Sequence, residues 1–348
     1  MNTCLESKVD PSIPVERIEG LRILLRSLGA KPEHEKLILR AWVSAQPLDR
    51  CKHQSEHYFP SSIREHLGAL TETFQSLGRL HSEYPSEDGS SRLLLKLRDS
   101  QLVETVLLPR DGVCVSSQVG CAVGCAFCMT GRSGLIRQLG SAEIVAQVVL
   151  ARTKQKIRKV VFMGMGEPSH NLNNVLEAID LLGTEGAIAH KQLVFSTVGD
   201  RRAFERLPQG RVKPALALSL HTTRSELRAK LLPRAPRIEP AELVELAEHY
   251  ARATTYPVQY QWTLIEGLND GEDEIEGIVK LLKGKRAILN LIPYNTVEDL
   301  SFKRPTWERA AALARTLHQR GILTKLRRSA GQDVDGGCGQ LRARAEVS

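Results

Sequence analysis

Helical periodicity of apolar side chains runs through the first 90 residues. Apolar positions recur every three or four residues over 21–28, and the same pattern returns over 35–43. A third stretch runs to Phe74 and begins at Ser61 or Ser62, which we expect to cap a helix. Polar residues 84–90 then mark a turn-rich boundary. We therefore predict a small helical N-terminal unit over residues 1–90.

The pattern changes to short apolar runs beyond this boundary. Residues 93–97 and 102–108 flank a polar turn, which predicts a β-hairpin. From residue 112, short apolar runs typical of buried strands are separated by amphipathic stretches. The predicted strands are 113–117, 159–163, 192–196, 215–220, 258–265, 287–292 and 322–326. The predicted helices are 141–152, 172–182, 241–253, 272–282 and 307–319.

Alternation of strand and helix predicts a parallel sheet with right-handed crossovers. Six to seven such units exceed a simple mononucleotide-binding fold and stop short of a closed eight-fold barrel. The predicted fold class is α/β: a partial (β/α) barrel over residues 91–341, with the hairpin before it and the small N-terminal helical domain. Residues 328–348 lack periodicity and are rich in glycine, and we set residues 342–348 apart as a tail.

Composition excludes several classes of protein. Of the 348 residues, 42% are hydrophobic and 25% charged, as in ordinary globular proteins. No apolar run could span a membrane, and residues 1–11 do not resemble a signal peptide, so we expect a cytoplasmic protein without a membrane partner. The net charge of +8 favours a polyanion such as RNA, although it could equally serve solubility alone.

Polar and glycine-rich segments follow four of the predicted strands. In a (β/α) barrel the carboxyl ends of the strands meet on one rim, where ligands bind. Each segment by itself is an ordinary turn, but four on one rim favour a ligand site. The segments are 164–168, 196–199, 219–221 and 290–295.

Three of the seven cysteines lie within eight residues, as Cys121, Cys125 and Cys128. Iron–sulfur clusters are usually held by four cysteines, so three ligands would leave one iron of a 4Fe–4S cluster open. A structural zinc site completed by a distant Cys or His is the alternative. Cys4 and Cys51 match no motif, and we treat them as incidental.

The C-x3-C-x2-C motif at the head of a β/α barrel resembles the radical S-adenosylmethionine (SAM) enzymes. The resemblance implies that the open iron binds the amino and carboxylate groups of SAM, and that an electron from the cluster cleaves SAM to a 5′-deoxyadenosyl radical. Gly166 and Glu167 fit this expectation, because glycine permits close approach of a ligand and a carboxylate accepts hydrogen bonds from an ammonium group.

Further motifs resemble the RlmN/Cfr family, which methylates adenine carbons in RNA. The resemblance extends from about residue 93 to residue 341. It implies contacts to SAM from Ser196, Ser219, Leu220, His221 and Asn295. The motifs are LPRDGVCVSSQVGC at 108–121, MGMGEP at 163–168, FSTVG at 195–199, SLH at 219–221, NLIPYN at 290–295 and DGGCGQL at 335–341.

Two lone cysteines and one carboxylate receive catalytic roles from this resemblance. Cys338 takes a methyl group from one SAM, and the radical formed from a second SAM activates that methyl group for addition to adenine. Cys114 then attacks the Cys338 sulfur, forming a transient disulfide and releasing the RNA, while Glu104 accepts the proton from the ring carbon. Without the resemblance, Cys114 would be a buried strand residue and Glu104 a solvent-facing one.

The resemblance leaves the substrate open. Residues 129–134 and the segment between Asn295 and Trp307 differ from the family pattern, and the N-terminal unit matches its RNA-binding extension only loosely. We expect C2 methylation of adenine in ribosomal RNA, with transfer RNA as a second substrate. The alternatives are C8 methylation, as by Cfr, a paralogue with another RNA target, and a non-catalytic RNA-binding protein with a structural metal site.

Other partners follow from the same expectation. A flavodoxin or ferredoxin would supply the electron, and the enzyme would be a monomer. Four basic clusters are candidates for contacts to the RNA backbone, at 154–159, 201–202, 283–286 and 325–328.

Overall fold

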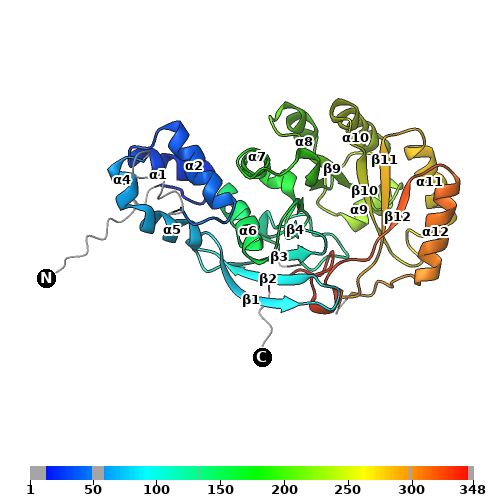
Figure 1. Ribbon diagram of the computed structural model, residues 1–348. Coiled ribbons are helices and arrows are strands. Elements are labelled where there is room, and N and C mark those ends of the chain that lie inside the picture. Colours follow the sequence, from blue (N-terminus) through cyan, green and yellow to red (C-terminus); the bar gives the residue numbers. More distant parts are fainter. Residues whose placement is uncertain (1–12, 49–58, 133, 298–299, 344–348) are drawn as a thin grey trace.

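The computed structural model describes residues 13–48, 59–132, 134–297 and 300–343. Its described part is organised around a ten-stranded sheet in the order β1-β2-β3-β4-β7-β8-β9-β10-β11-β12. Figure 1 shows the strands curving along the inside of an arc of helices, with the N-terminal helices at one end and α12 at the other. No helix in the described ranges has the length and apolar character needed to cross a membrane.

The N-terminal unit is helical up to Ser76, but residues 79–85, which the prediction included in it, form strand β1 of the sheet. The helices are α1 (Ile18–Ser27), α2 (Pro32–Val43), α4 (Ser61–Glu65) and α5 (Leu67–Ser76). The predicted cap is wrong, because Pro60 holds the N-cap position of α4 and the Ser62 hydroxyl instead donates to the Leu28 carbonyl at 2.6 Å. Apolar side chains of this unit join one continuous core with those of the sheet and of α6.

An antiparallel edge precedes the parallel strands. Its strands are β1 (Arg79–Pro85), β2 (Ser91–Lys96), β3 (Leu102–Leu108) and β4 (Gly112–Cys114). The predicted hairpin is confirmed by the antiparallel pairing of β2 with β3. The pattern missed β1, since this outer strand is largely solvent-exposed and lacks the apolar alternation of a half-buried strand.

From β4 onward all neighbouring strands of the large sheet pair in parallel, which confirms the predicted partial barrel. The strands are β7 (Lys159–Phe162), β8 (Leu193–Thr197), β9 (Ala215–Ser219), β10 (Val258–Leu264), β11 (Ala287–Pro293) and β12 (Thr324–Leu326). The helices are α6 (Ser141–Lys154), α7 (Leu172–Gly183), α8 (Arg201–Arg206), α9 (Ser225–Leu231), α10 (Pro240–Thr254), α11 (Glu272–Leu282) and α12 (Trp307–Gln319). Short 3-10 helices are η2 (Pro168–Asn171), η3 (His190–Gln192), η4 (Leu207–Gln209) and η5 (Gln332–Val334).

Side-chain alternation divides the parallel strands into two faces. Val160 and Phe195 point to the helices and belong to the main core, whereas Val161 and Ala217 form a separate small cluster inside the barrel. Cys114 packs against that inner cluster. Because strand side chains alternate with a period of two, the inner face also receives the serines at the ends of β8 and β9.

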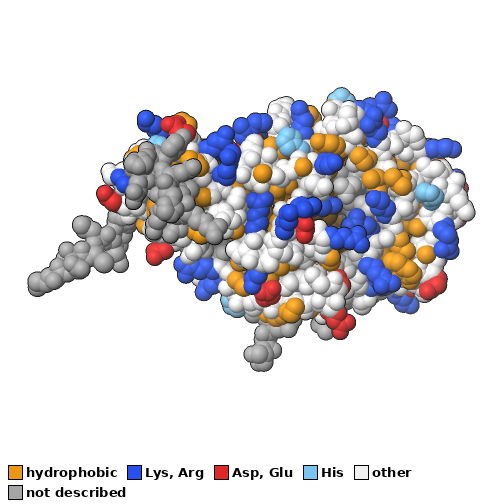
Figure 2. Space-filling model, viewed as in Figure 1, with side chains coloured by type: hydrophobic (Ala, Val, Ile, Leu, Met, Phe, Trp, Pro, Cys, Tyr) orange, Lys and Arg blue, Asp and Glu red, His pale blue; other side chains and the backbone are white. Residues whose placement is uncertain are grey.

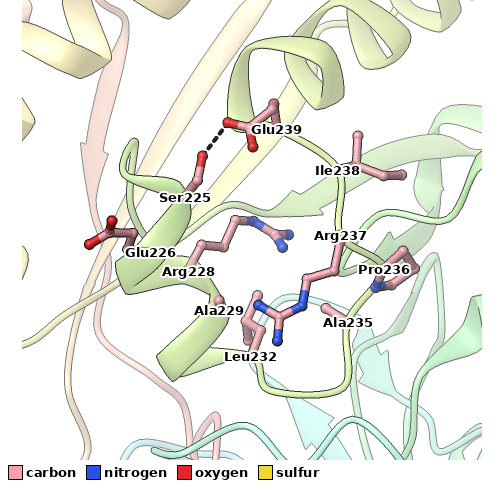
Figure 3. A pocket seen from close by; sticks show the side chains of 10 residues that line it. All are labelled: Ser225, Glu226, Arg228, Ala229, Leu232, Ala235, Pro236, Arg237, Ile238 and Glu239. Atoms are coloured by element: carbon pink, nitrogen blue, oxygen red, sulfur yellow. Dashed lines mark hydrogen bonds between the residues drawn. The ribbon is translucent and has the colours of Figure 1, made fainter.

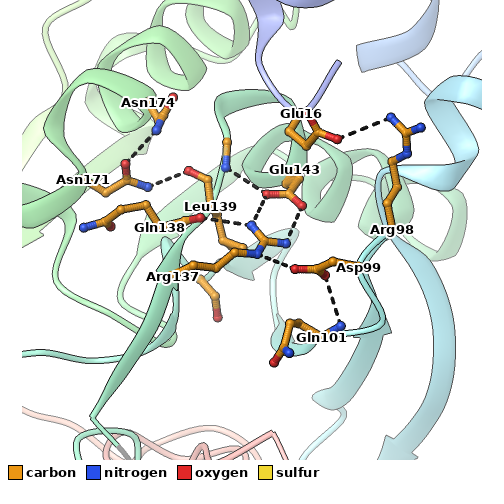
Figure 4. A network of polar contacts seen from close by, with 12 residues as sticks. Glu16, Arg98, Asp99, Gln101, Arg137, Gln138, Leu139, Glu143, Asn171 and Asn174 are labelled. Atoms are coloured by element: carbon orange, nitrogen blue, oxygen red, sulfur yellow. Dashed lines mark hydrogen bonds and ion pairs between the residues drawn. The ribbon is translucent and has the colours of Figure 1, made fainter. Parts of the chain in front are cut away.

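An ionic network around one buried carboxylate holds the start of α6 (Figure 4). Arg137, on the hairpin strand β6 (Leu135–Gln138), makes two 2.8 Å hydrogen bonds to the Glu143 carboxylate and one of 2.6 Å to Asp99. Glu143 also accepts from the Gly140 N–H at 2.8 Å, which satisfies a free donor at the helix start. The network therefore joins α6, the β2–β3 turn and the β5–β6 hairpin, whose first strand is β5 (Gln118–Gly120).

Candidate active site

The three clustered cysteines lie on the loop between β5 and β6. Two glycines make this loop compact: Gly120 has φ +76°, and a Cβ there would lie 2.0 Å from the Gly134 carbonyl oxygen. A Cβ on Gly131 would lie 2.7 Å from the Cα of Gly124. Side chains at these positions would open the loop, so glycine is required for its tight path.

The three thiols of this loop face a common space. Cys121 is buried, Cys125 and Cys128 are half-buried, and all three are free. Burial raises the pKa of Cys121 to about 12, and burial with the charges of Cys128 and Cys121 raises the pKa of Cys125. The charge of Glu167 raises the pKa of both thiols further, so this carboxylate adjoins the same space.

This donor set fits an iron–sulfur cluster. Within the described ranges, no three His, Cys, Asp or Glu side chains converge closely enough to hold a single metal ion. A 4Fe–4S cluster makes a different demand, since each thiolate binds a different iron and the ligands surround the cluster. Three thiols around one buried space, with no fourth cysteine on the loop, match that demand.

Glu167 is held rigidly beside the thiols by the loop after β7. Its Oε1 accepts from the N–H and the hydroxyl of Ser169 at 3.1 and 2.7 Å, and its Oε2 accepts from the Val198 N–H at 3.0 Å. Gly166, with φ +99°, has no room for a Cβ, which would lie 2.6 Å from the Gln118 side chain. A carboxylate has about four acceptor positions, so Glu167 retains one for a ligand.

His221 closes the site from the end of β9. Its ring meets Phe127 of the cysteine loop edge-on, with centroids 4.9 Å apart. Its Nδ1 accepts from the Thr263 N–H at 3.0 Å, which leaves the proton on Nε2. Burial lowers the pKa of His221 to about 3, with the charge of Arg228 acting in the same direction, so the ring is neutral at physiological pH.

The other predicted SAM contacts surround the same rim. Ser196 is nearly buried on β8, and Ser219 ends β9. The Leu220 side chain is buried in the main core, so only its backbone can face a ligand. Asn295 donates to the Cys338 carbonyl at 2.9 Å and to Ser329 at 2.8 Å, while its buried Oδ1 has no hydrogen-bond partner among the described residues.

The chain segment that carries Cys338 is tied to both sides of the barrel opening. On the cysteine loop, Met129 N–H donates to the Gly339 carbonyl at 2.8 Å, and the Thr130 hydroxyl donates to Leu341 at 2.6 Å. On the antiparallel edge, Arg92 donates to the Val334 carbonyl at 2.5 Å. The glycine-rich tail therefore has a defined position, beside the cysteine loop.

Cys114 and Cys338 lie near enough to each other for their charges to interact. Burial raises the pKa of Cys114, and the charge of Cys338 raises it further. Burial also raises the pKa of Cys338, against the lowering effects of the Ser329 hydroxyl and the Arg327 charge. The Cys338 side chain is nonetheless in contact with solvent, as expected for a thiol in a concave opening. The two are free thiols, with no disulfide between them.

Glu104 differs from its expected solvent-facing position. It is 0% exposed, and its Oε1 accepts from Arg92 at 2.6 Å. Its Oε2 accepts from the backbone N–H groups of Arg342 and Ala343, at 2.7 and 3.0 Å. The carboxylate therefore lies beneath the same tail that carries Cys338, with both oxygens engaged.

Sequence reasoning missed two buried arginines. Arg92 holds both the Glu104 carboxylate and the tail, and Arg228 reaches the ends of β8 and β9. The signal for Arg92 was its place beside the three leucines of strand 91–96. A cation buried there normally requires a negatively charged partner. Arg228 lay in a segment with no predicted element. Cys4 and Cys51 lie outside the described residues.

Comparisons with known proteins agree with this geometry. The sequence profile of the radical SAM superfamily matches residues 115–282, which include the cysteine loop and Glu167. The chain belongs to the radical SAM superfamily. A crystal structure of a radical SAM methyltransferase from Sphaerobacter thermophilus is similar, with a TM-score of 0.82 and 32% identity, covering 96% of this chain and 100% of that one.

Two similar relatives within this superfamily carry the name "Probable RNA methyltransferase". The protein from Leptothrix cholodnii is 69% identical over 94% of this chain and 94% of its own length. The protein from Aromatoleum aromaticum is 69% identical over 95% of this chain and 94% of its own length. The chain is therefore a member of their family, and membership implies a 4Fe–4S cluster and SAM as cofactors.

Proposed function

We propose that the protein methylates an adenine ring carbon, C2, in ribosomal RNA, with transfer RNA as a second substrate. Methylation proceeds through an S-methylcysteine intermediate. The observation that carries this proposal is the position of Cys338, which lies near Cys114 and beside the loop of three cysteines. A barrel that used SAM without a protein-bound methyl carrier would not require two neighbouring thiols in addition to the three thiols of the loop.

The cofactors would occupy the space between the cysteine loop and the strand ends. Cys121, Cys125 and Cys128 would hold the cluster. Bound there, the cluster and SAM supply the one-electron chemistry that a non-nucleophilic adenine carbon requires. The SAM contacts would come from Gly166, Glu167, Ser196, Ser219, the backbone of Leu220, His221 and Asn295.

The chain's own residues carry the methyl group and the proton. The Cys338 thiolate attacks the methyl group of SAM and keeps it as a thioether. Once that carbon is bonded to the base, the Cys114 thiolate attacks the Cys338 sulfur; the bond between Cys338 sulfur and carbon breaks, the carbon takes the electron pair and a proton to become the methyl group of the product, and an external thiol reductant returns the disulfide to two thiols. Glu104 accepts the ring proton; because it is 0% exposed beneath Arg342 and Ala343, this end of the tail must move before the base can reach it.

Basic side chains support an RNA partner. Figure 2 shows Lys and Arg side chains gathered over the middle of the displayed face. Burial lowers the pKa of Lys159, and the charges of Arg327 and Lys325 lower it further, so two of the predicted basic clusters meet. Mutual repulsion of cations is relieved by a bound polyanion. The N-terminal unit, residues 1–90, would extend this RNA-binding surface.

Mass spectrometry of cellular RNA tests the proposal. RNA from cells with and without the gene is digested to nucleosides and scored for 2-methyladenosine and 8-methyladenosine. Loss of 2-methyladenosine on deletion, restored by the wild-type gene and not by Cys338→Ala, is the expected result. Loss of 8-methyladenosine would favour the Cfr-like alternative, and no change in either nucleoside would favour a non-catalytic RNA-binding protein.

Two further expectations remain predictions. A flavodoxin or ferredoxin would donate the electron, and the enzyme would act as a monomer. Reconstitution with either reduced donor and size-exclusion chromatography with light scattering would test them.

A further inference from the structure

Arg228 is a buried cation next to the cofactor space. It lies on α9, and its residue is only 4% exposed. Its Nη2 donates to the carbonyl oxygens of Val198 and Ser219, the latter at 3.1 Å. Its Nε–H is buried and has no hydrogen-bond partner among the described residues. An unpaired N–H on a buried guanidinium is costly, which indicates an absent acceptor.

The surroundings of Arg228 identify where that acceptor lies. The helix α9 is bonded to the cysteine loop, because the Ala126 N–H donates to the Leu231 carbonyl at 2.9 Å. Val198 links Arg228 to Glu167, since its carbonyl accepts from Arg228 and its N–H donates to Glu167. Arg228 therefore lies close to both Glu167 and the cysteine loop, near enough to Cys125 for their charges to interact.

The charge of Arg228 persists at physiological pH. Burial lowers its pKa to about 10, and the charges of Cys125 and Glu167 oppose that decrease. Figure 3 shows Arg228 extending from α9 within a surface pocket of about 280 Å³, with Arg237 on the loop opposite. Arg237 is exposed to solvent, whereas Arg228 is buried, although both line the same pocket.

We propose that Arg228 serves as the fixed, buried counter-cation of the iron–sulfur cluster. The inference rests on the proposed cluster. Three thiolates on a 4Fe–4S core of charge 2+ leave a net charge of about −1, and one-electron reduction makes it more negative. A fixed positive charge in a water-poor site stabilises the reduced form more than the oxidised form. Arg228 therefore raises the reduction potential, with no change in its own protonation.

A redox titration tests this role without RNA or SAM. Wild type, Arg228→Gln and Arg228→Lys are reconstituted anaerobically with iron and sulfide and titrated with a low-potential chemical reductant. Absorbance and electron paramagnetic resonance report the reduced fraction. The potential should become more negative in Arg228→Gln and fall less in Arg228→Lys, which keeps a charge. Arg237→Gln is the matched control and should keep the wild-type potential.

The remaining outcomes also decide the question. Unchanged potential with weakened SAM binding would assign Arg228 to the SAM carboxylate and overturn the proposal. Unchanged potential and unchanged SAM binding would also overturn it, and would leave Arg228 as a structural link between β8 and β9. If Arg228→Gln does not fold, the neutral variant Arg228→Met takes its place, and an unchanged potential in Arg228→Met overturns the proposal. A wild-type protein that takes up no cluster would instead reject the cluster in the proposed function.

Discussion

Cys114 and Cys338 are 224 positions apart in the chain, yet the charge of one raises the pKa of the other. Their distinct settings predict distinct defects. Cys338 is exposed in the opening and accessible to a large substrate, whereas Cys114 is a half-buried strand residue. The exposed thiol suits the methyl carrier, and the enclosed thiol suits the resolving step.

Cys114→Ala should trap RNA on the protein. The variant still loads the methyl group and bonds it to the base, but it lacks the thiolate that cleaves the adduct. A band of retarded mobility that nuclease digestion removes should appear on a denaturing gel. Cys338→Ala should give neither methylated RNA nor adduct, and Cys51→Ala should behave as wild type. Normal turnover by Cys114→Ala without trapped RNA would contradict the two-thiol mechanism.

His221 should make stability depend on pH. Its folded pKa of about 3 lies below the ordinary value of 6.5, so the unfolded chain binds the proton more readily. The stability due to the neutral ring is fully present above pH 6.5 and declines as pH falls toward 3, by at most about 1.4 kcal/mol per pH unit. Anaerobic urea unfolding between pH 7.5 and 5 measures this slope.

Two substitutions of histidine by asparagine, which does not titrate, provide the test and its control. His221→Asn retains a side chain tolerated at the left-handed φ of +62° and should show a shallower decline of stability with falling pH than wild type. His249→Asn, an exposed residue of α10, should keep the wild-type slope. Equal slopes for wild type and His221→Asn would contradict a buried, neutral imidazole.

At the scale of elements, α6 depends on charge for its position. The Glu143 side chain is 0% exposed. It accepts two hydrogen bonds from the Arg137 guanidinium and one from the Gly140 N–H. The same arginine reaches Asp99, so one side chain sets the distance between α6, the β2–β3 turn and the hairpin that flanks the cysteine loop. The positions of the three thiols depend on the position of that hairpin.

Arg137→Ala should lower the free energy of unfolding by about 3 kcal/mol, because it leaves a buried carboxylate without its cation. Arg98→Ala is the matched control. It removes a 3.4 Å ion pair to Glu16 in which both side chains are exposed, and it should cost less than about 1 kcal/mol. Urea titration measures the loss of unfolding free energy in each variant, and equal losses would contradict the structural role of Arg137.

The element scale also shows where sequence patterns succeed. Strands 215–220 and 258–265 were predicted within one residue of β9 and β10, because both are central and lie between packed layers. The helices α8 and α9 were missed, since six or seven residues are too few for a helical period to register. Their positions depend on contacts with distant segments, such as that of α9 with the cysteine loop.

For the whole molecule, the distribution of charge matters more than its sum. Lys159 on β7 and Lys325 and Arg327 at β12 act on one another, although more than 160 residues separate them in the chain. Arg327 also lowers the pKa of Cys338, so this cationic group lies near the proposed methyl carrier. RNA bound here would bring its backbone close to the reacting thiol.

RNA affinity should fall steeply with salt. Each neutralised phosphate contributes a slope of about −0.7 to the log–log plot for single strands. The double variant Lys325→Gln/Arg327→Gln should make the slope shallower by about 0.7 for each phosphate that these side chains no longer neutralise. Lys280→Gln, on the outer helix α11, should leave the slope unchanged. Filter binding across a salt series measures it, and a flat wild-type response would contradict backbone binding.

The sequence alone determined the class of fold, the order of the parallel strands and of the longer helices, and the three-cysteine loop. These features depend on local periodicity and on spacing within a short segment, which a linear pattern records. The family motifs also singled out Cys114, Cys338 and Glu104 by type and position. What these residues face was decided only by the tertiary structure.

The enclosure of Glu104 is the clearest case. Its burial depends on Arg92 from the neighbouring strand and on backbone donors from Arg342 and Ala343, more than 230 positions away. Likewise, Arg228 matters because folding brings α9 between Glu167 and the thiols. Burial and electrostatic partners come from contacts between distant segments, and periodicity within one segment carries no record of them.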